Sequence, residues 1–367
     1  MIYPANFEEK IGFDRIREQV TALCSTPSAK AKLAEEGFST SADEIERRLS
    51  LMNEMRSLLM LERDFPDGDY PDPAPLVAKI RVEGSYLLAA EADQLRKALV
   101  TVGAIAEFIL GRGGARYPRL WELSRRVTLF PEIVRAIDAI LDDRGEVKDS
   151  ASPELQQVRR AIREREGQAA KRLQQVLQRA KQAGIVDADA VLSVRDGRPV
   201  IPVAAANKRK LQGFIHDESA TGRTFYVEPV EVVEINNELK ELEYAERREV
   251  VKVLSAFTES IRPDAEAIAD AGDYLSSVDM IRAKARWALA NDAGKPILST
   301  DDRLELRTAR HPLLQQTLRA QGREVVPLDL ALDRRKHILV ISGPNAGGKS
   351  VCLKTTGLMQ YLFQCGY

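Results

Sequence analysis

The sequence has few cysteines and no long hydrophobic run. Its three cysteines, at positions 24, 352 and 365, match neither a disulfide framework nor a zinc-binding spacing, so free thiols are expected. No apolar stretch approaches the roughly 18 residues of a membrane helix. Residues 1–10 contain two acidic residues and no apolar segment, which argues against a signal peptide. Together these absences predict a cytoplasmic protein without a membrane partner.

Aromatic residues and net charge are also scarce. Aromatics make up 6% of the chain and charged residues 30%, a balance that favours long solvated helices. The net charge is −1, so the overall charge indicates no partner and only its local distribution is informative. With 367 residues and 44% hydrophobic content, the chain can bury a core and is expected to form two or three domains.

An apolar, strand-like segment at 338–342 runs directly into a glycine-rich octet. The octet fits the phosphate-binding P-loop pattern and consists of Gly343, Pro344, Asn345, Ala346, Gly347, Gly348, Lys349 and Ser350. Its glycines allow successive backbone N–H groups to point at one anion, and a helix beginning near Lys349 would direct its positive end at the phosphates. Lys349 is expected to reach the β- and γ-phosphates of ATP, and Ser350 to hold Mg²⁺. The alternative is a chance glycine-rich turn, against which the flanking strand and helix patterns argue.

A complete P-loop ATPase also requires a Walker B carboxylate and a group that positions water. Both come from strands that follow the P-loop, and the sequence ends at Tyr367, shortly after Ser350. We therefore expect no catalytic residue among these residues. The chain is interpreted as the first part of a longer ATPase and is expected to be inactive by itself.

The first 150 residues are expected to form a helical body. Apolar residues three or four apart predict one helix over about 6–21 and another from Ser41 or Asp43 to about residue 61. A cluster of proline, glycine and aspartate at 64–75 predicts a loop. Further helices are expected over 75–81, 89–110 and 131–141.

Two long helices of complementary charge follow. Ser152 caps a helix start with proline and glutamate behind it, and a heptad seam then runs to about residue 183. A second helix with its own apolar stripe spans about 229–261. Residues 154–181 carry eight Lys/Arg and three Glu, whereas residues 231–252 carry seven Glu and four Lys/Arg. Antiparallel pairing would satisfy both seams and both charges, and two independent solvated helices are the alternative.

The segment between these helices, 191–229, is expected to form a small sheet, because β-branched pieces alternate with Asp-Gly and Thr-Gly turns. This segment also holds the sharpest basic cluster of the chain. The cluster consists of Lys208, Arg209 and Lys210, with Arg195, Arg198 and Arg223 nearby. Such a patch at the end of an arm suits phosphate contacts on a nucleic acid. An ordinary solvated turn is the alternative.

These patterns predict a mainly α fold with a small β insertion. We expect a helical core and lever at 1–150, then a coiled-coil clamp arm with a β tip and a return helix at 151–292. The first part of an α/β P-loop ATPase domain should follow at 295–367. Short strands are expected there at 304–306 and 325–327.

The order of these parts is informative, because the arm precedes the P-loop. In the ABC-type and chromosome-maintenance ATPases the P-loop comes first, whereas the present order resembles the MutS family. The segments ARHPLL at 309–314, and VVPLDLAL with HILVISGPNAGGKS at 325–350, are similar to the opening of a MutS ATPase domain. The segments RDGRPVIPV at 195–203 and GFIHDESATGRTFYVEPVEVVEINNEL at 213–239 resemble the second bacterial type of this family. That type lacks the mismatch-reading domain and carries a C-terminal Smr nuclease domain.

The resemblance covers essentially the whole chain. It implies a homodimer that binds branched, junction-like DNA in an ATP-dependent way and suppresses homologous recombination, with endonuclease activity supplied by the Smr domain. Some members of the family act on collided ribosomes and split them. The ribosome and its rRNA are therefore an alternative target, because rRNA offers the same phosphate charge. A clamp or dimerisation module without catalysis is a further alternative.

Overall fold

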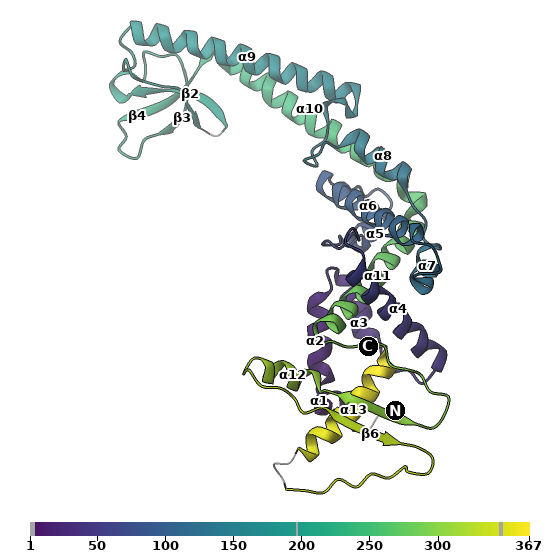
Figure 1. Ribbon diagram of the computed structural model, residues 1–367. Helices are drawn as coiled ribbons and strands as arrows, with labels where there is room; N and C mark the ends of the chain where they lie inside the picture. Colours follow the sequence, from purple (N-terminus) through teal and green to yellow (C-terminus); the bar gives the residue numbers. More distant parts are fainter. Residues whose placement is uncertain (1–3, 196, 345–347) are drawn as a thin grey trace. The chain divides into compact units, whose positions relative to one another are not determined.

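The computed structural model describes residues 4–195, 197–344 and 348–367, and the chain divides into two compact units (Figure 1). The body unit comprises Met1–Glu83, Glu91–Val134 and Ile261–Tyr367. The arm unit comprises Gly84–Ala90 and Arg135–Ser260. Helices dominate both units and the sheets are small, so the expected mainly α fold with a β insertion is confirmed.

The elements of the body are mostly helical. In chain order they are α1 (Phe7–Ile11), α2 (Phe13–Leu23), α3 (Pro27–Glu35), α4 (Ala42–Leu61), α5 (Ala74–Ile80), α6 (Ala89–Gly111), α7 (Pro118–Ser124), η3 (Arg262–Asp264), α11 (Ala265–Ala290), β5 (Leu304–Ala309), α12 (Pro312–Arg319), β6 (Leu328–Leu332) and α13 (Lys349–Cys365).

The arm unit combines long helices with one sheet. Its elements, including those that begin or end at its boundary, are α8 (Pro131–Ile140), η1 (Asp149–Ala151), α9 (Pro153–Gln182), β1 (Ser193–Arg195), β2 (Arg198–Ala204), η2 (Ala205–Asn207), β3 (Gly213–Glu218), β4 (Thr224–Pro229) and α10 (Val230–Ile261). Within the described ranges, no helix of either unit has the length and apolar character needed to cross a membrane.

The helix expected over 6–21 is in fact two helices. α1 ends and α2 begins at Gly12, whose φ of 78° is a left-handed conformation that favours glycine. A Cβ atom at this position would lie 2.9 Å from Leu313 Cδ1 of α12. The break is therefore set by the backbone and by a close tertiary contact, while the apolar spacing continues through both helices.

Two helix starts that the sequence predicts are confirmed. The side chain of Ser41 accepts a hydrogen bond from the backbone N–H of Glu44 at the start of α4. The side chain of Ser152 accepts one from the N–H of Leu155, at 3.0 Å, at the start of α9. Each serine satisfies a first-turn N–H that has no partner inside the helix.

The body is built around α11, which packs against α2, α3, α4 and α5. A buried polar network fixes these contacts. The fully buried carboxylate of Asp279 accepts hydrogen bonds from the N–H and the hydroxyl of Thr26, the N-cap of α3, at 2.8 and 3.0 Å. The Asp279 carboxylate also forms an ion pair with Arg282 at 2.9 Å. The guanidinium of Arg282 lies 4.0 Å from the ring centroid of Tyr70. The Nε of Arg282 has no hydrogen-bond partner, but the contacts of the buried Asp279 tie the N-terminus of α3 to α11.

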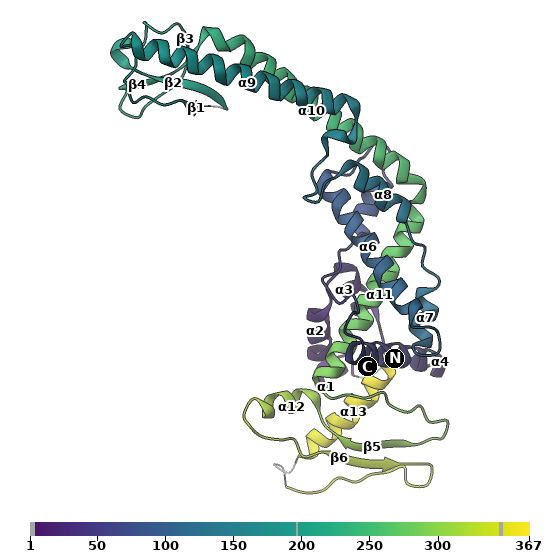
Figure 2. The same cartoon turned by 45° about the horizontal axis from the view of Figure 1, so that its top comes forward.

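The two long helices of the arm unit run antiparallel, as their charges predict. α9 and α10 lie side by side in both views (Figures 1 and 2). Three ion pairs join them in opposite chain directions, namely Arg159–Glu246 at 2.7 Å, Arg165–Glu238 at 2.7 Å and Arg179–Glu231 at 3.2 Å. The alternative of two independent solvated helices is thereby excluded.

The segment between α9 and α10 forms the expected small sheet. Its strands are antiparallel in the order β1-β2-β4-β3, with Ile201 of β2 opposite Val227 of β4. Both residues are buried in a cluster with Leu173 and Val176 of α9. The sheet is thus covered on one face by the end of α9, which gives it the apolar support that a small sheet needs.

The region before the P-loop contains a two-stranded antiparallel sheet, β5–β6. The strand expected at 304–306 is part of β5, whereas residues 325–327 lie before β6, outside any strand. The prediction of a strand at 338–342 was also wrong for the described chain, where no strand pairs with this segment and Ile338 is 77% exposed. A continuous apolar run forms a strand when neighbours cover both of its faces, and these neighbours are missing from the described residues.

Candidate nucleotide and nucleic-acid sites

The helix after the P-loop begins where the motif predicts. Lys349 is the first residue of α13, and Gly348 precedes it with a φ of 84°, which favours glycine. The Lys349 ammonium donates a hydrogen bond to the carbonyl of Gly343, so the two ends of the loop are in contact. The predicted positions Asn345, Ala346 and Gly347 lie outside the described residues.

The start of α13 has the donors that a triphosphate needs. Its first-turn N–H groups have no partner inside the helix and lie at the positive end of the helix dipole. Pro344 and Ser350 are exposed, so the site is open to solvent. Among the described residues, no group of three or more His, Cys, Asp or Glu side chains could hold a metal ion.

The other end of α13 is anchored in the body by a buried lysine. Lys284 of α11 is 3% exposed and donates a hydrogen bond to the carbonyl of Cys365 at 3.1 Å. It also pairs with Glu36, and its Nζ lies 4.4 Å from the ring centroid of Tyr367. Burial lowers the pKa of Lys284, and the neighbouring carboxylate partly opposes this effect. One charged side chain thus joins α11 to the far end of the helix that starts at Lys349.

The predicted basic cluster is exposed at one end of the sheet. Lys208, Arg209 and Lys210 follow η2. Arg223 is the fourth basic residue beside them, because its carbonyl accepts a hydrogen bond of 2.9 Å from the N–H of Ala205. The Lys208 ammonium lies 4.5 Å from the centroid of an aromatic ring of β4. Within the described part of the chain, none of these four basic side chains forms an ion pair. Their charge is therefore available to an anionic partner.

The structure places the other two predicted basic residues differently. Arg195 pairs with Asp217 at 2.9 Å and lies 3.8 Å from the ring centroid of Tyr226. Arg198 pairs with Glu228, with distances of 2.9 and 3.0 Å from its Nη1 to the two carboxylate oxygens. Both guanidinium groups hold the sheet together, which leaves less of their charge for a phosphate than the exposed cluster has.

The sequence patterns did not predict a role for the buried carboxylate of Glu228 in this sheet. Glu228 of β4 is 1% exposed and, besides Arg198, it contacts His216 Nε2 and accepts a hydrogen bond from Asn236, each at 2.6 Å. Burial would raise the pKa of Glu228, but the hydrogen bonds from Asn236, His216 and Arg198 outweigh it and lower the pKa. The network joins β2, β3, β4 and α10. No local pattern marks it, because its members are far apart in the chain.

Comparison with known proteins identifies the type of sequence. No family model matches the chain. Three curated relatives are named "Endonuclease MutS2": those of Bacillus velezensis (32% identical), Thermomicrobium roseum (34%) and Pelotomaculum thermopropionicum (32%). The alignments cover 96%, 96% and 98% of this chain but 44%, 45% and 44% of the relatives, so the chain spans less than half their length. Over nearly its whole length the chain is therefore similar to proteins of the MutS2 type.

Proposed function

We propose that this chain supplies the nucleotide-binding loop and a nucleic-acid-binding arm to a MutS-type ATPase. The observation that carries the first half is the position of the P-loop at the start of α13, with Gly348 in a left-handed conformation and Lys349 at the first helical position. ATP would bind with its β- and γ-phosphates against the N–H groups of α13 and Lys349. Mg²⁺ would join the phosphates to Ser350.

The proposed target is branched DNA, bound in an ATP-dependent way by a homodimer that suppresses homologous recombination. The exposed cluster of Lys208, Arg209 and Lys210 supports a phosphate-binding role for the arm. The relatives are named endonucleases.

The ribosome is the second candidate target. The same exposed cluster favours it equally, since phosphate contacts carry no information about sequence and rRNA presents the same charge as DNA. In that case the arm would grip rRNA, and the work driven by ATP would be mechanical.

A competition experiment decides between the two targets. The intact ATPase is bound to a labelled four-way DNA junction with ATP and Mg²⁺ at physiological salt, and unlabelled duplex DNA or stalled ribosomes are added in separate titrations. The recombination role predicts that the junction resists duplex DNA and that ribosomes displace it weakly. Displacement by ribosomes at nanomolar concentration would make the ribosome the primary target. Failure to bind either target would refute the nucleic-acid half of the proposal.

A further inference from the structure

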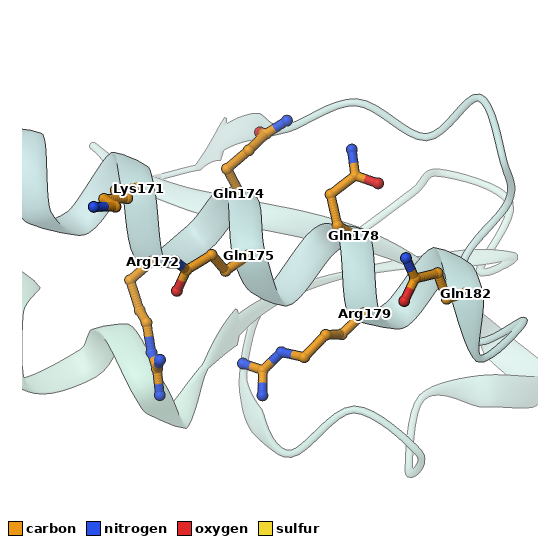
Figure 3. Close-up of a pocket in the computed structure, with 7 residues that line it drawn as sticks. All are labelled: Lys171, Arg172, Gln174, Gln175, Gln178, Arg179 and Gln182. Carbon is orange, nitrogen blue, oxygen red and sulfur yellow. The ribbon is translucent and has the colours of Figure 1, made fainter.

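The outer surface of α9 carries a shallow groove with an unusual composition (Figure 3). The groove has a volume of about 620 Å³, and three cations and four glutamines line it. The cations are Lys171, Arg172 and Arg179, and the glutamines are Gln174, Gln175, Gln178 and Gln182. All seven side chains come from one helix and are exposed to solvent. The surface therefore offers hydrogen-bond donors and positive charge without any apolar side chain.

The helical period separates this surface from the core. Leu173, Val176, Leu177 and Ala180 are buried beneath the sheet of the arm unit. Residues at spacings of three and four from one another share a helix face, so Lys171 and the glutamines lie on the side opposite these apolar residues. The surface is thus not needed to hold the arm together.

The two halves of α9 differ in whether their basic residues form ion pairs. In the first half every arginine has an acidic partner: Arg159 pairs with Asp149 and Glu246, Arg160 with Glu164, Arg163 with Asp149 and Arg165 with Glu238. From residue 167 to residue 186 the sequence has four basic residues and no acidic one. Within the described residues, Lys171 and Arg172 form no ion pair, and Arg179 has a single partner at 3.2 Å. A helix face that served only solubility would mix both signs, as the first half does.

The groove suits a regular polyanion. From Lys171 to Gln182 the helix rises about 16 Å at roughly 1.5 Å per residue. A nucleic-acid duplex presents about one negative charge per 1.7 Å of its axis, so a surface of this length faces several phosphates at once. Glutamine amides donate to phosphate and sugar oxygens without reading the bases. An acidic protein surface would instead favour a denser set of cations and would gain little from the glutamines.

We propose that the exposed surface of α9 from Lys171 to Gln182 is a sequence-independent contact surface for the backbone of a nucleic-acid duplex. The cations contact phosphates, and the glutamines donate to phosphate and sugar oxygens. This inference rests on the proposed nucleic-acid-binding function and adds a second contact surface, on the helix rather than at the end of the sheet.

The test uses two double variants of the same helix. Lys171→Gln with Arg172→Gln removes two charges from the groove. Arg160→Gln with Arg163→Gln removes two charges from the first half, where both arginines are also exposed. The affinity of the chain for a labelled DNA duplex, and for an RNA duplex of the same sequence, is measured against salt concentration by fluorescence anisotropy. Polyglutamate serves as the acidic competitor, and circular dichroism checks that both variants remain helical.

The groove variant should bind more weakly at low salt, and its log–log salt slope on duplex DNA should fall by up to about 1.8, at ~0.9 for each lost phosphate contact. The control variant should keep the slope of the unmodified chain. An effect on one duplex alone identifies DNA or RNA as the ligand that the groove prefers.

Three results would overturn the inference. The first is an unchanged slope in the groove variant, which becomes decisive if replacing Lys208, Arg209 and Lys210 by alanine does reduce the slope. The second is an equal loss in both double variants, which would indicate only the total charge of the helix. The third is displacement of the duplex by polyglutamate at an equal concentration of charge. If the unmodified chain binds neither duplex, the proposed function fails as well, and that outcome is distinct from the other three.

Discussion

Replacing Glu228 with glutamine would test how the sheet of the arm unit is held together. The carboxylate is 1% exposed and accepts hydrogen bonds from Arg198 at 2.9 and 3.0 Å and from Asn236 at 2.6 Å, and it contacts His216 at 2.6 Å. Glutamine keeps the shape of the side chain but removes the charge. The glutamine amide also has an N–H₂ group where the second carboxylate oxygen accepts hydrogen bonds in the unmodified protein. Two donors would then face each other.

The magnitude follows from the burial of the two partners. Removing one member of a buried charged pair destabilises a protein by about 3–5 kcal/mol. The Arg198 side chain is 23% exposed and donates another hydrogen bond, to Asn237 at 3.1 Å, so water and this amide offset part of the loss. We therefore expect Glu228→Gln to destabilise the sheet by about 2–3 kcal/mol, equivalent to roughly a 30- to 140-fold rise in local opening.

Hydrogen exchange measures this opening directly. The amides of Ile201 and Val227, paired across β2 and β4, should lose protection by that factor in the variant. The pH dependence gives a second readout, because the pKa of Glu228 in the folded chain lies below its ordinary value of 4.5. The stability that Glu228 contributes is complete above about pH 4.5 and is lost as the pH falls through the folded pKa. The unmodified chain should show this loss, and the variant should not.

Glu218→Gln is the matched control, because Glu218 lies on β3 of the same sheet and is exposed. The same chemical change there should leave the protection of β2 and β4 unaltered. If the two variants show equal protection and equal pH profiles, the Glu228 network does not hold the sheet, and the reasoning from burial and hydrogen bonding is refuted.

Three further outcomes are expected. Lys349→Ala should weaken ATP binding by roughly 100-fold or more, because the β- and γ-phosphates lose a charged partner; retained tight binding in isothermal titration calorimetry would contradict the P-loop role. Asp279→Asn should reduce the free energy of unfolding of the body by about 3 kcal/mol in urea titrations, since the buried Arg282 loses one of its two carboxylate partners and keeps Asp67 at 3.1 Å; an unchanged unfolding curve would show that the network is dispensable. Burial raises the pKa of the Cys24 and Cys365 thiols to about 12. At pH 8 iodoacetamide should therefore alkylate the half-buried Cys352 first. Equal alkylation rates of the three cysteines in mass spectrometry would contradict the described burial.

The sequence predicts best those features whose causes lie within a few residues. Ser152 and the proline after it start α9 because the cap and the first-turn N–H groups are neighbours in the chain. The left-handed Gly348 and the start of α13 at Lys349 follow from the P-loop pattern in the same way. The antiparallel pairing of α9 and α10 was also predictable, because a heptad seam and an opposite excess of charge are properties of each helix alone.

The sequence predicted less well where a distant segment decides the outcome. The apolar spacing over 6–21 predicts one helix, but Gly12 breaks it beside Leu313, about 300 residues later in the chain. The apolar run at 338–342 has the composition of a buried strand and forms none in the described chain, because strand formation depends on neighbours that the run does not itself supply.

The basic residues show the same difference between what the local sequence predicts and what distant segments decide. The sequence by itself determined that the chain is mainly helical, that a P-loop precedes α13 and that α9 and the segment 195–223 carry an excess of basic residues. Only the tertiary structure decided how those basic residues are used: Arg198 is paired with the buried Glu228, whereas Lys171 faces solvent without an acidic partner among the described residues. The physical reason is that a helix cap or a loop motif is satisfied within one turn, whereas the partner of a charge is set by which strands and helices the fold brings together.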